Sequence, residues 1–255
     1  MRVNEYIMML EADLVERLLS PLRRHPNVAT DPALVRCIDT MIEEEREHYR
    51  CFAALNRACF PDIYEKRERY FAAVPWPTHV LFQAVGLVAG RLPFALWYFM
   101  AMEESSAALA RDLARHSVTA LGEIEPTYAT VHREHLKDEL RHVQIDGALV
   151  ELCLARSPRS LRRLNAVLFK SLLGAVTRPT RMGSGVKVVR ELVRQMPELS
   201  FREEEMIRAV LALKNDKAFQ TSLFNRRIMP LTFGVFDTVP ELDDLGRRMV
   251  GYDRH

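Results

Sequence analysis

Apolar side chains recur every three or four residues along nearly the whole chain, as Ile38, Met41 and Ile42 illustrate. This is the period of an amphipathic α-helix, and no segment shows the strict alternation of a half-buried strand. The pattern therefore predicts an all-α fold. Four long helices are expected, over residues 3–20, 31–59, 93–117 and 125–157, with a shorter amphipathic piece ending near residue 71.

Proline and capping residues set the expected helix ends. Pro21 ends the first helix, and Asp31-Pro32 begins the second, because Asp caps a helix N-terminus and Pro fits its first turn. Residues 1–158 are expected to form the bundle and residues 159–255 a helical extension packed on it, as one domain overall. Within the extension we expect a loop over 177–185, a capping box from Ser200 to Glu203, and an irregular apolar segment over 229–239 that packs back onto the bundle.

The segment Val80–Met102 is almost entirely apolar and could be mistaken for a membrane span. Arg91 and Pro93 divide it into two runs of eleven residues, whereas a span needs roughly 18–20. We therefore expect two buried helices here and no membrane segment.

Charge and cysteine usage narrow the function classes. The chain has 36 basic and 34 acidic residues, a net charge of +2, so no strong field favours nucleic acid or an anionic membrane. The four cysteines form no Cys-x-x-Cys pair, which argues against a zinc site or a redox dithiol. The N-terminal residues lack the pattern of a signal peptide, and a cytoplasmic protein with reduced thiols is expected.

Two helices carry the same short motif, a glutamate followed three residues later by a histidine. The second helix has Glu45 and His48, and the fourth has Glu139 and His142. Residues three apart share a helix face, so each pair can bind one metal ion. One such pair alone is weak evidence, because Glu and His are common enough to produce it by chance.

The intervals between carboxylates strengthen this prediction. Glu45 follows Glu11, and Glu139 follows Glu103 or Glu104, at nearly the same interval. A helix, a turn and a helix of roughly 35 residues bring two carboxylates back to the same height, given the rise of about 1.5 Å per residue. The layout is that of a bundle in which each of four helices contributes a carboxylate.

The phase of the third helix favours Glu103 over Glu104. Glu103 lies in phase with apolar residues such as Phe99, whereas Glu104 lies in phase with Arg111 and Arg115 and is expected to face water. Four carboxylates on core faces would repel one another without cations, because an unpaired buried ion costs on the order of several kcal/mol. Their charge balances two Fe(II) ions. Carboxylates and imidazoles without cysteine suit iron, with manganese as an alternative, better than zinc.

These residues resemble the ferritin-like di-iron carboxylate superfamily over about residues 3–156. His135, four residues before Glu139, is similar to the additional histidine of the p-aminobenzoate N-oxygenase family. The resemblance implies a ferritin-like four-helix bundle with additional C-terminal helices. It implies a ligand set of Glu11, Glu45, His48, Glu103, His135, Glu139 and His142, with His135 on the same ion as His142. Asp138 would orient a ligating histidine, His48.

The resemblance also implies an activity. Two Fe(II) ions would activate dioxygen and oxidise the amine nitrogen of a small metabolite to a hydroxylamine, nitroso or nitro group. An external electron donor, a ferredoxin or a reductase, would restore the reduced state, and a monomer or homodimer is expected. Glu103 and Glu139 are further apart than in the family pattern, which indicates an enlarged loop near Gly122, and His132 stays open as an alternative to His135.

Three alternatives stay open at this point: a di-iron hydroxylase or desaturase, an iron-binding ferroxidase, and a structural helical protein. The radical-bearing subunit of ribonucleotide reductase fits less well, because Phe52 stands where it carries a tyrosine. Trp97, Tyr98, Phe99 and Met102 could line a substrate pocket, and one of the many arginines could hold a substrate carboxylate, but the sequence does not choose among them.

Overall fold

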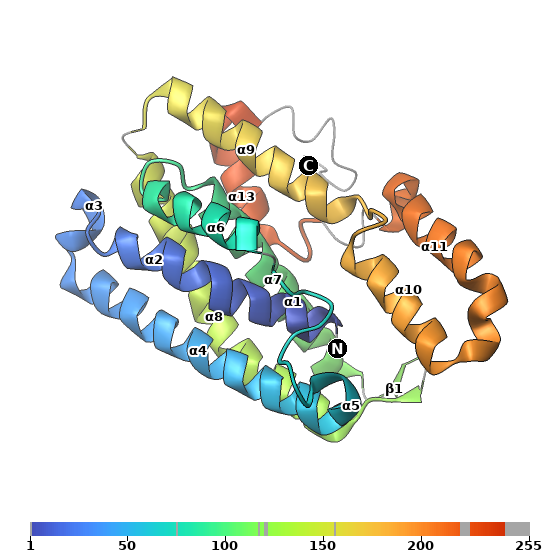
Figure 1. Ribbon diagram of the computed structural model, residues 1–255. Coiled ribbons are helices and arrows are strands. Elements are labelled where there is room, and N and C mark those ends of the chain that lie inside the picture. Colours follow the sequence, from blue (N-terminus) through green and yellow to red (C-terminus); the bar gives the residue numbers. More distant parts are fainter. Residues whose placement is uncertain are drawn as a thin grey trace.

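The computed structural model describes residues 2–74, 76–116, 118–119, 122–155, 157–219 and 225–242. Most of these residues are helical, and the strands form a single two-stranded hairpin within the described ranges, which confirms the all-α prediction. Figure 1 shows the long helices lying side by side, with the later helices of the chain packed beside them.

The first helical segment is continuous but not uniform. It consists of α1 (Arg2–Leu10), a π-helical turn η1 (Glu11–Val15) and α2 (Glu16–Leu22). Pro21 lies inside α2, so the predicted end at Ser20 is wrong by two residues. Pro21 has no N–H to offer the Arg17 carbonyl, and α6 (Trp76–Val88) packs at this point, where a Cβ on Gly86 would lie 2.3 Å from the Arg17 oxygen. Glycine therefore lets α6 approach the interrupted turn.

The second long helix begins where its cap predicts. After the short α3 (Pro26–Ala29), α4 covers Pro32–Cys59. The Asp31 side chain accepts hydrogen bonds from the N–H groups of Ala33 and Leu34 at 2.9 and 3.2 Å. The predicted cap and both helix ends are confirmed.

The amphipathic piece predicted up to Phe71 is mostly wrong. Helix α5 covers only Pro61–Tyr64. Beyond it, the buried Glu5 carboxylate accepts hydrogen bonds from the N–H groups of Tyr70 and Ala72, both at 2.8 Å. These two bonds hold the backbone in an irregular path against α1.

The long apolar stretch forms two helices, as predicted: α6 and α7 (Phe94–Arg115). Every side chain from Phe94 to Glu104 is buried, whereas α6 lies on the surface against α2 and exposes Leu81 and Leu87. The expectation of two buried helices is therefore right for α7 and wrong for α6. Residue 117, the predicted end of the third helix, lies outside the described residues. Within the described ranges, no helix is long and apolar enough to cross a membrane.

A hairpin connects α7 to the fourth long helix. Strand β1 (Val118–Thr119) pairs antiparallel with β2 (Gly122–Glu123), and Gly122 has φ +117°, which glycine adopts without strain. Helix α8 (Pro126–Leu154) follows, and the Glu125 carboxylate accepts a hydrogen bond from the Tyr128 N–H in its first turn. This hairpin occupies the connection that was expected to be enlarged.

Helix α8 packs against several other helices of the bundle. It contacts α7 and α4, and α4 in turn contacts the whole α1–η1–α2 segment. One apolar core fills the space between these helices, with members such as Leu18, Ile38, Leu96 and Leu149. One face of each long helix therefore points to a shared interior, and the predicted site residues lie on those faces.

The C-terminal helices cover part of the bundle. Helix α9 (Arg159–Thr177) packs on α7, and α13 (Pro230–Thr238) packs on α7 and α8. Helices α10 (Ser184–Gln195) and α11 (Glu203–Ala212) contact each other and are connected by the 3₁₀ turn η2 (Pro197–Arg202). Two further 3₁₀ turns are η3 (Leu213–Asn215) and η4 (Pro240–Leu242).

Two predictions for this region are wrong. Ser200 lies inside η2, and the N-cap of α11 is Arg202, which makes no side-chain cap bond, so the capping box is not formed. The segment 229–239 is mostly the helix α13 rather than irregular, although it packs back onto the bundle as predicted. The predictions for residues 220–224 and 243–255 lie outside the described ranges.

Candidate metal centre

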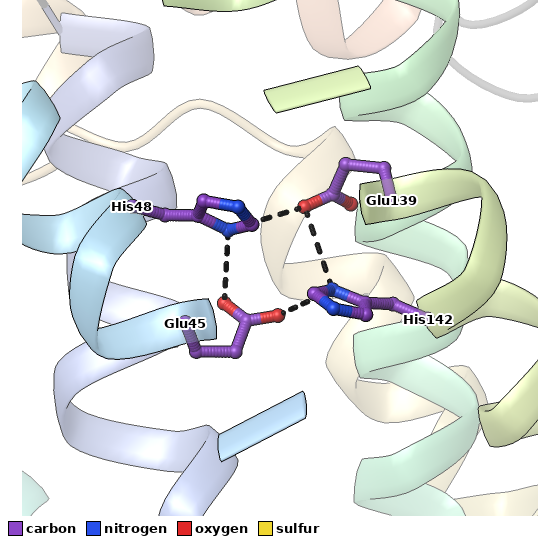
Figure 2. A group of neighbouring side chains, drawn as sticks. All are labelled: Glu45, His48, Glu139 and His142. Carbon is purple, nitrogen blue, oxygen red and sulfur yellow. Dashed lines mark ion pairs between the residues drawn. The ribbon is translucent and has the colours of Figure 1, made fainter. Parts of the chain in front are cut away.

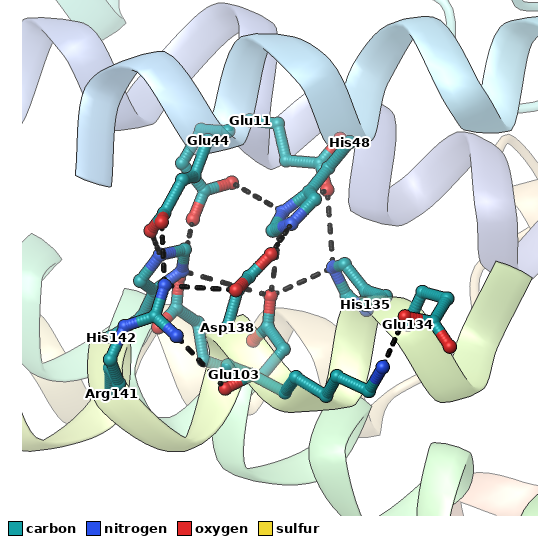
Figure 3. Close-up of polar contacts among 12 residues, drawn as sticks. Glu11, Glu44, His48, Glu103, Glu134, His135, Asp138, Arg141 and His142 are labelled. Carbon is teal, nitrogen blue, oxygen red and sulfur yellow. Dashed lines mark hydrogen bonds and ion pairs between the residues drawn. The ribbon is translucent and has the colours of Figure 1, made fainter. Parts of the chain in front are cut away.

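Four helical segments bring the predicted site residues to one place in the interior. All of these side chains are buried, with exposed fractions of at most 7%. Figures 2 and 3 show them converging from the facing helices. They are Glu11 at the start of η1, Glu45 and His48 on α4, Glu103 on α7, and His135, Glu139 and His142 on α8.

The two Glu-x-x-His motifs face each other (Figure 2). Glu45 lies between the two histidines, with Oε1 2.9 Å from Nδ1 of His142 and Oε2 3.9 Å from Nδ1 of His48. The Oε1 atom of Glu139 lies 4.0 Å from each of the same two nitrogens. Ligand atoms of these four residues all lie within 4.8 Å of one another, so they could hold a metal ion. Both glutamates are placed where a carboxylate could bridge two ions.

A second group lies beside the first. The Oε1 atom of Glu11 is 3.4 Å from Nε2 of His135 and 3.9 Å from Nδ1 of His48, and these three residues could also hold an ion. The His135 and His48 rings meet edge to face at 4.4 Å between centroids. His135 therefore lies on the His48 side of the cluster, whereas the sequence led us to expect it with His142.

Glu103 lies on the other side. Its Oε1 atom is 4.0 Å from Nδ1 of His142. Glu104 points away: its carboxylate accepts hydrogen bonds from the N–H groups of Leu231 and Thr232, both at 2.8 Å, at the N-terminus of α13. Of the two glutamates, Glu103 is thus the one in the cluster. The expectation that Glu104 faces water is wrong, because α13 covers it.

His132, the alternative to His135, lies outside the cluster. It is fully buried, and its Nε2 atom is 3.2 Å from the Asn4 side-chain oxygen. Its ring packs against Phe52 and Tyr128. Burial lowers the pKa of His132 to about 4, so it is a neutral core histidine.

An outer layer of hydrogen bonds fixes the two motif histidines (Figure 3). His48 Nε2 is 3.0 Å from the Asp138 carboxylate, which is the contact expected from the sequence, and His142 Nε2 is 2.9 Å from Glu44. Arg141 contacts both acids, Glu44 at 2.5 Å and Asp138 at 2.9 Å. With Nε2–H donated outward, the Nδ1 lone pair of each ring faces the cluster, as a metal-binding histidine requires.

Sequence reasoning missed Glu44, although a signal existed. Each motif is preceded by an acid, as Glu44-Glu45 and Asp138-Glu139. Each acid bonds the histidine of the opposite motif, so the arrangement is reciprocal. The repeated acid-Glu-x-x-His pattern would have predicted both contacts.

Asp146 was also missed. It is fully buried on α8, one turn beyond His142 and on the same face, and neither of its oxygens has a hydrogen-bond partner among the described residues. Burial raises its pKa well above the usual range, against the attraction of His142 and together with repulsion from Glu45. Its spacing from Glu139 and His142 is the helical signal that could have indicated it.

Burial favours protonated carboxyl groups in the cluster. Burial raises the pKa of Glu11 to about 8, against the hydrogen bond from His135, and burial with repulsion from Glu139 raises that of Glu103 well above its usual range. Burial disfavours the charged form of His142, but Glu45 outweighs it and raises the pKa to about 9. Such shifts are typical of a site whose negative charges are matched to ions.

The donor atoms fit metal ions. Both oxygens of Glu103 and Nδ1 of His48 are buried without hydrogen-bond partners among the described residues, and the nearest groups to Glu11 Oε1 and His142 Nδ1 are other members of the cluster. Two neighbouring ligands, each about 2.1 Å from one octahedral ion, lie about 3 Å apart, and the closest contacts here are 2.7, 2.9 and 3.4 Å. Buried carboxylates that face one another without enough hydrogen-bond donors are costly, and cations would satisfy them.

Two cavities reach the cluster, and a third lies next to one of them. One of about 20 Å³ lies among Glu11, Glu45, Glu103 and Glu139 and is large enough for a small occupant such as a water molecule. One of about 350 Å³ reaches Glu11 and Glu45 between η1 and α4. The largest, about 790 Å³, is lined mostly by apolar residues and shares Leu10 with the smallest.

No protein-family model, no curated protein and no solved structure matches this chain. The functional conclusions therefore rest on the positions and chemistry of the side chains themselves.

Proposed function

We propose that this chain is a ferritin-like di-iron oxygenase that uses dioxygen to oxidise an amine nitrogen. The observation that carries the proposal is a third histidine, His135, buried beside two facing Glu-x-x-His motifs and 2.7 Å from Glu139. Three imidazoles and four carboxylates from four helical segments form a ligand set for two ions. The resemblance of this set to the p-aminobenzoate N-oxygenase family supports the amine as substrate.

The distances suggest how the ligands would divide. Glu11, His48 and His135 would bind one ion, Glu103 and His142 the other, and Glu45 and Glu139 would bridge them. The first ion would have five protein ligands and the second four. The four carboxylates would balance the charge of two Fe(II) ions.

Bound iron would supply the redox chemistry of dioxygen activation. The balanced overall step is R–NH₂ + O₂ + 2 e⁻ + 2 H⁺ → R–NHOH + H₂O, with both electrons coming from an external ferredoxin or reductase. The chain's own residues hold the ligands in place and exclude water. Asp138 and Glu44 orient the histidines, and Phe99 and Met102 wall the small cavity beside the carboxylates.

The first prediction concerns iron content and oxygen transfer. Anaerobic titration with Fe(II) should saturate at about two ions per chain, measured by elemental analysis of the desalted protein. Reduced protein given ¹⁸O₂ and a panel of primary amines, with p-aminobenzoate among them, should convert at least one amine to its hydroxylamine with one ¹⁸O, detected by mass spectrometry. The control variant Glu45→Gln removes a bridging carboxylate and should lose both iron and product.

Three results would contradict the proposal. Saturation at one ion per chain, or tight binding of zinc in place of iron, would show that the site is not a di-iron centre. Oxidation of added Fe(II) in the presence of amines, with no oxygen transferred to nitrogen, would favour a ferroxidase. Insertion of ¹⁸O at carbon would favour a hydroxylase.

A further inference from the structure

The largest of the three cavities described above lies between the bundle and the C-terminal helices. One wall comes from α1, η1, α6 and α7, and the other from α9, the connection after it, α10 and α11. Its volume of about 790 Å³ falls in the upper part of the range of about 300–1,000 Å³ that is typical of small-molecule sites. The lining is dominated by leucine, valine and phenylalanine side chains, so an extended apolar ligand would fit it best.

The few polar groups of the cavity fall into two sets. Tyr6 on α1 and Tyr98 on α7 face each other, with their hydroxyls hydrogen-bonded. Arg178, Thr180 and Ser184 come from the opposite wall, at the connection between α9 and α10. A ligand that fills the cavity would therefore meet polar groups on both walls and apolar side chains between them.

Arg178 is the only charged side chain among the described residues that line this cavity. It pairs with no acidic side chain in the described part of the chain, whereas Arg181, three residues later, pairs with Glu204 at 2.6 Å. An arginine at the edge of an apolar cavity is suited to a carboxylate or another planar anion. Its counter-ion would then come from the ligand.

The wall opposite Arg178 leads to the metal cluster. Leu10 lines both the large cavity and the small one among the carboxylates, and Leu14, which also lines the large cavity, lies in the π-helical turn that begins with Glu11. Tyr98 precedes Phe99, which lines the small cavity. A ligand in the large cavity would thus have one end near Arg178. It would also lie against the wall that the large cavity shares with the small cavity among the carboxylates.

The geometry points to the substrate class of this site: a single-chain amphiphile with a long apolar body and one carboxylate end, the carboxylate held by Arg178. This inference rests on the proposed function, because it names that enzyme's substrate. In an amine substrate of this class, the nitrogen would be carried toward the opposite, metal-side end of the chain.

Direct binding tests this inference without turnover. Isothermal titration of the Mn(II)-loaded protein with octanoate, decanoate and dodecanoate, below their micelle concentrations, should show saturable binding near one per chain. Each added methylene should tighten binding by up to about fourfold while the cavity still has room. Dodecan-1-ol, which lacks the anion, should bind about five- to tenfold more weakly than dodecanoate.

Matched variants test separately how much the Arg178 charge and the space in the cavity contribute to binding. Arg178→Gln should weaken the binding of dodecanoate about five- to tenfold and leave the affinity for dodecan-1-ol unchanged. Arg181→Gln should change neither affinity. Val85→Trp on α6 should block both ligands, because Val85 lines the cavity; Val80→Trp, on an exposed position of the same helix, should block neither.

The outcomes distinguish this inference from the proposed function. If two metal ions bind but dodecanoate does not, or if it binds with no dependence on chain length, the inference is wrong and the di-iron proposal stands. Equal binding by wild type and Arg178→Gln would also overturn it. If dodecanoate binds as expected but the protein holds no iron, the substrate pocket stands and the proposed oxygenase fails.

Discussion

At the scale of single residues, the centre depends on buried groups that satisfy one another across helices. Asp138 and Glu44 each bond the histidine of the opposite motif, at 3.0 and 2.9 Å. These contacts fix both rings with Nδ1 facing inward, so the cluster is organised without an ion. Adjacent glutamates can have unrelated roles in the same helix, as Glu103 and Glu104 do.

The second prediction separates Glu103 from Glu104. Glu103→Gln should reduce bound iron from about two ions per chain to about one and abolish oxygen transfer, because it removes a ligand. Glu104→Gln should keep the iron but lower the free energy of unfolding by about 1–2 kcal/mol, because it weakens the acceptor that caps α13. Elemental analysis and denaturant melts measure the two effects. The opposite pattern would mean that Glu104 is the ligand.

The third prediction concerns His135. His135→Ala should still fold and bind iron through the remaining ligands, but amine oxidation should fall at least tenfold, because an ion loses the imidazole placed next to Glu11 and Glu139. His132→Ala is the control: it removes a buried histidine outside the cluster, so it should lower stability and leave iron content and product yield per iron intact. If His135→Ala oxidised amines at the wild-type rate, the N-oxygenase assignment would be wrong.

At the scale of elements, the π-helical turn η1 places Glu11. A π-turn contains about one residue more than an α-turn, which shifts the helix face by about 100° for the residues before it. Here Glu11, Asp13, Leu14 and Val15 are all buried while Ala12 is exposed. The widened turn lets Glu11 face the cluster while Leu10 and Leu14 face the large cavity.

The fourth prediction removes this turn. Deleting Ala12 should convert η1 to an α-turn and rotate Glu11 by about 100° relative to α2, so iron content should fall while the helical circular dichroism is largely kept. Ala12→Gly is the control, because it keeps the length of the turn; it should cost about 1 kcal/mol of stability and retain iron. Two ions bound by the deletion variant would show that the π-turn is not needed to place Glu11.

At the scale of the whole molecule, protonation of the buried Glu/His cluster couples to folding. The pKa values of Glu11 and His142 are raised to about 8 and about 9 without metal. In an unfolded chain these groups titrate near 4.3 and 6.5. Between pH 6.5 and 8, the native metal-free protein therefore holds protons that the unfolded chain has already released.

The fifth prediction follows from this difference. The free energy of unfolding of metal-free protein should fall as pH rises from 6.5 to 8, since the native state binds more protons than the unfolded state in this window. One retained proton across about 1.5 pH units corresponds to about 2 kcal/mol. Mn(II) replaces these protons, so metal-loaded protein should lose less stability and metal affinity should rise with pH.

Thermal melts at pH 6.5, 7.2 and 8.0, with chelator or with Mn(II), measure this effect. Glu11→Gln is the control, because it removes one of the titrating groups and should flatten the pH dependence of the metal-free protein. Metal-free stability that is constant or rises over this range would show that the cluster does not hold these protons.

The sequence by itself determined what depends on neighbours along one helix. The apolar period, the Asp31 cap and the proline positions are local, so they predicted α4 and the start of α8 closely. The two Glu-x-x-His motifs are also local, because residues three apart share a face in any helix. The placement of Glu45, His48, Glu139 and His142 toward one interior followed from phase alone.

Tertiary structure decided whatever depends on contacts between distant segments. Glu104 is buried because α13, 127 residues later, supplies two N–H groups to it, and the Glu5 carboxylate holds the backbone at Tyr70 and Ala72 in an irregular path. His135 lies with His48 rather than His142 because α4 and η1 pack on that side of α8. Helical phase fixes a residue's direction from its own axis, but only the packing of neighbouring helices fixes what it meets there.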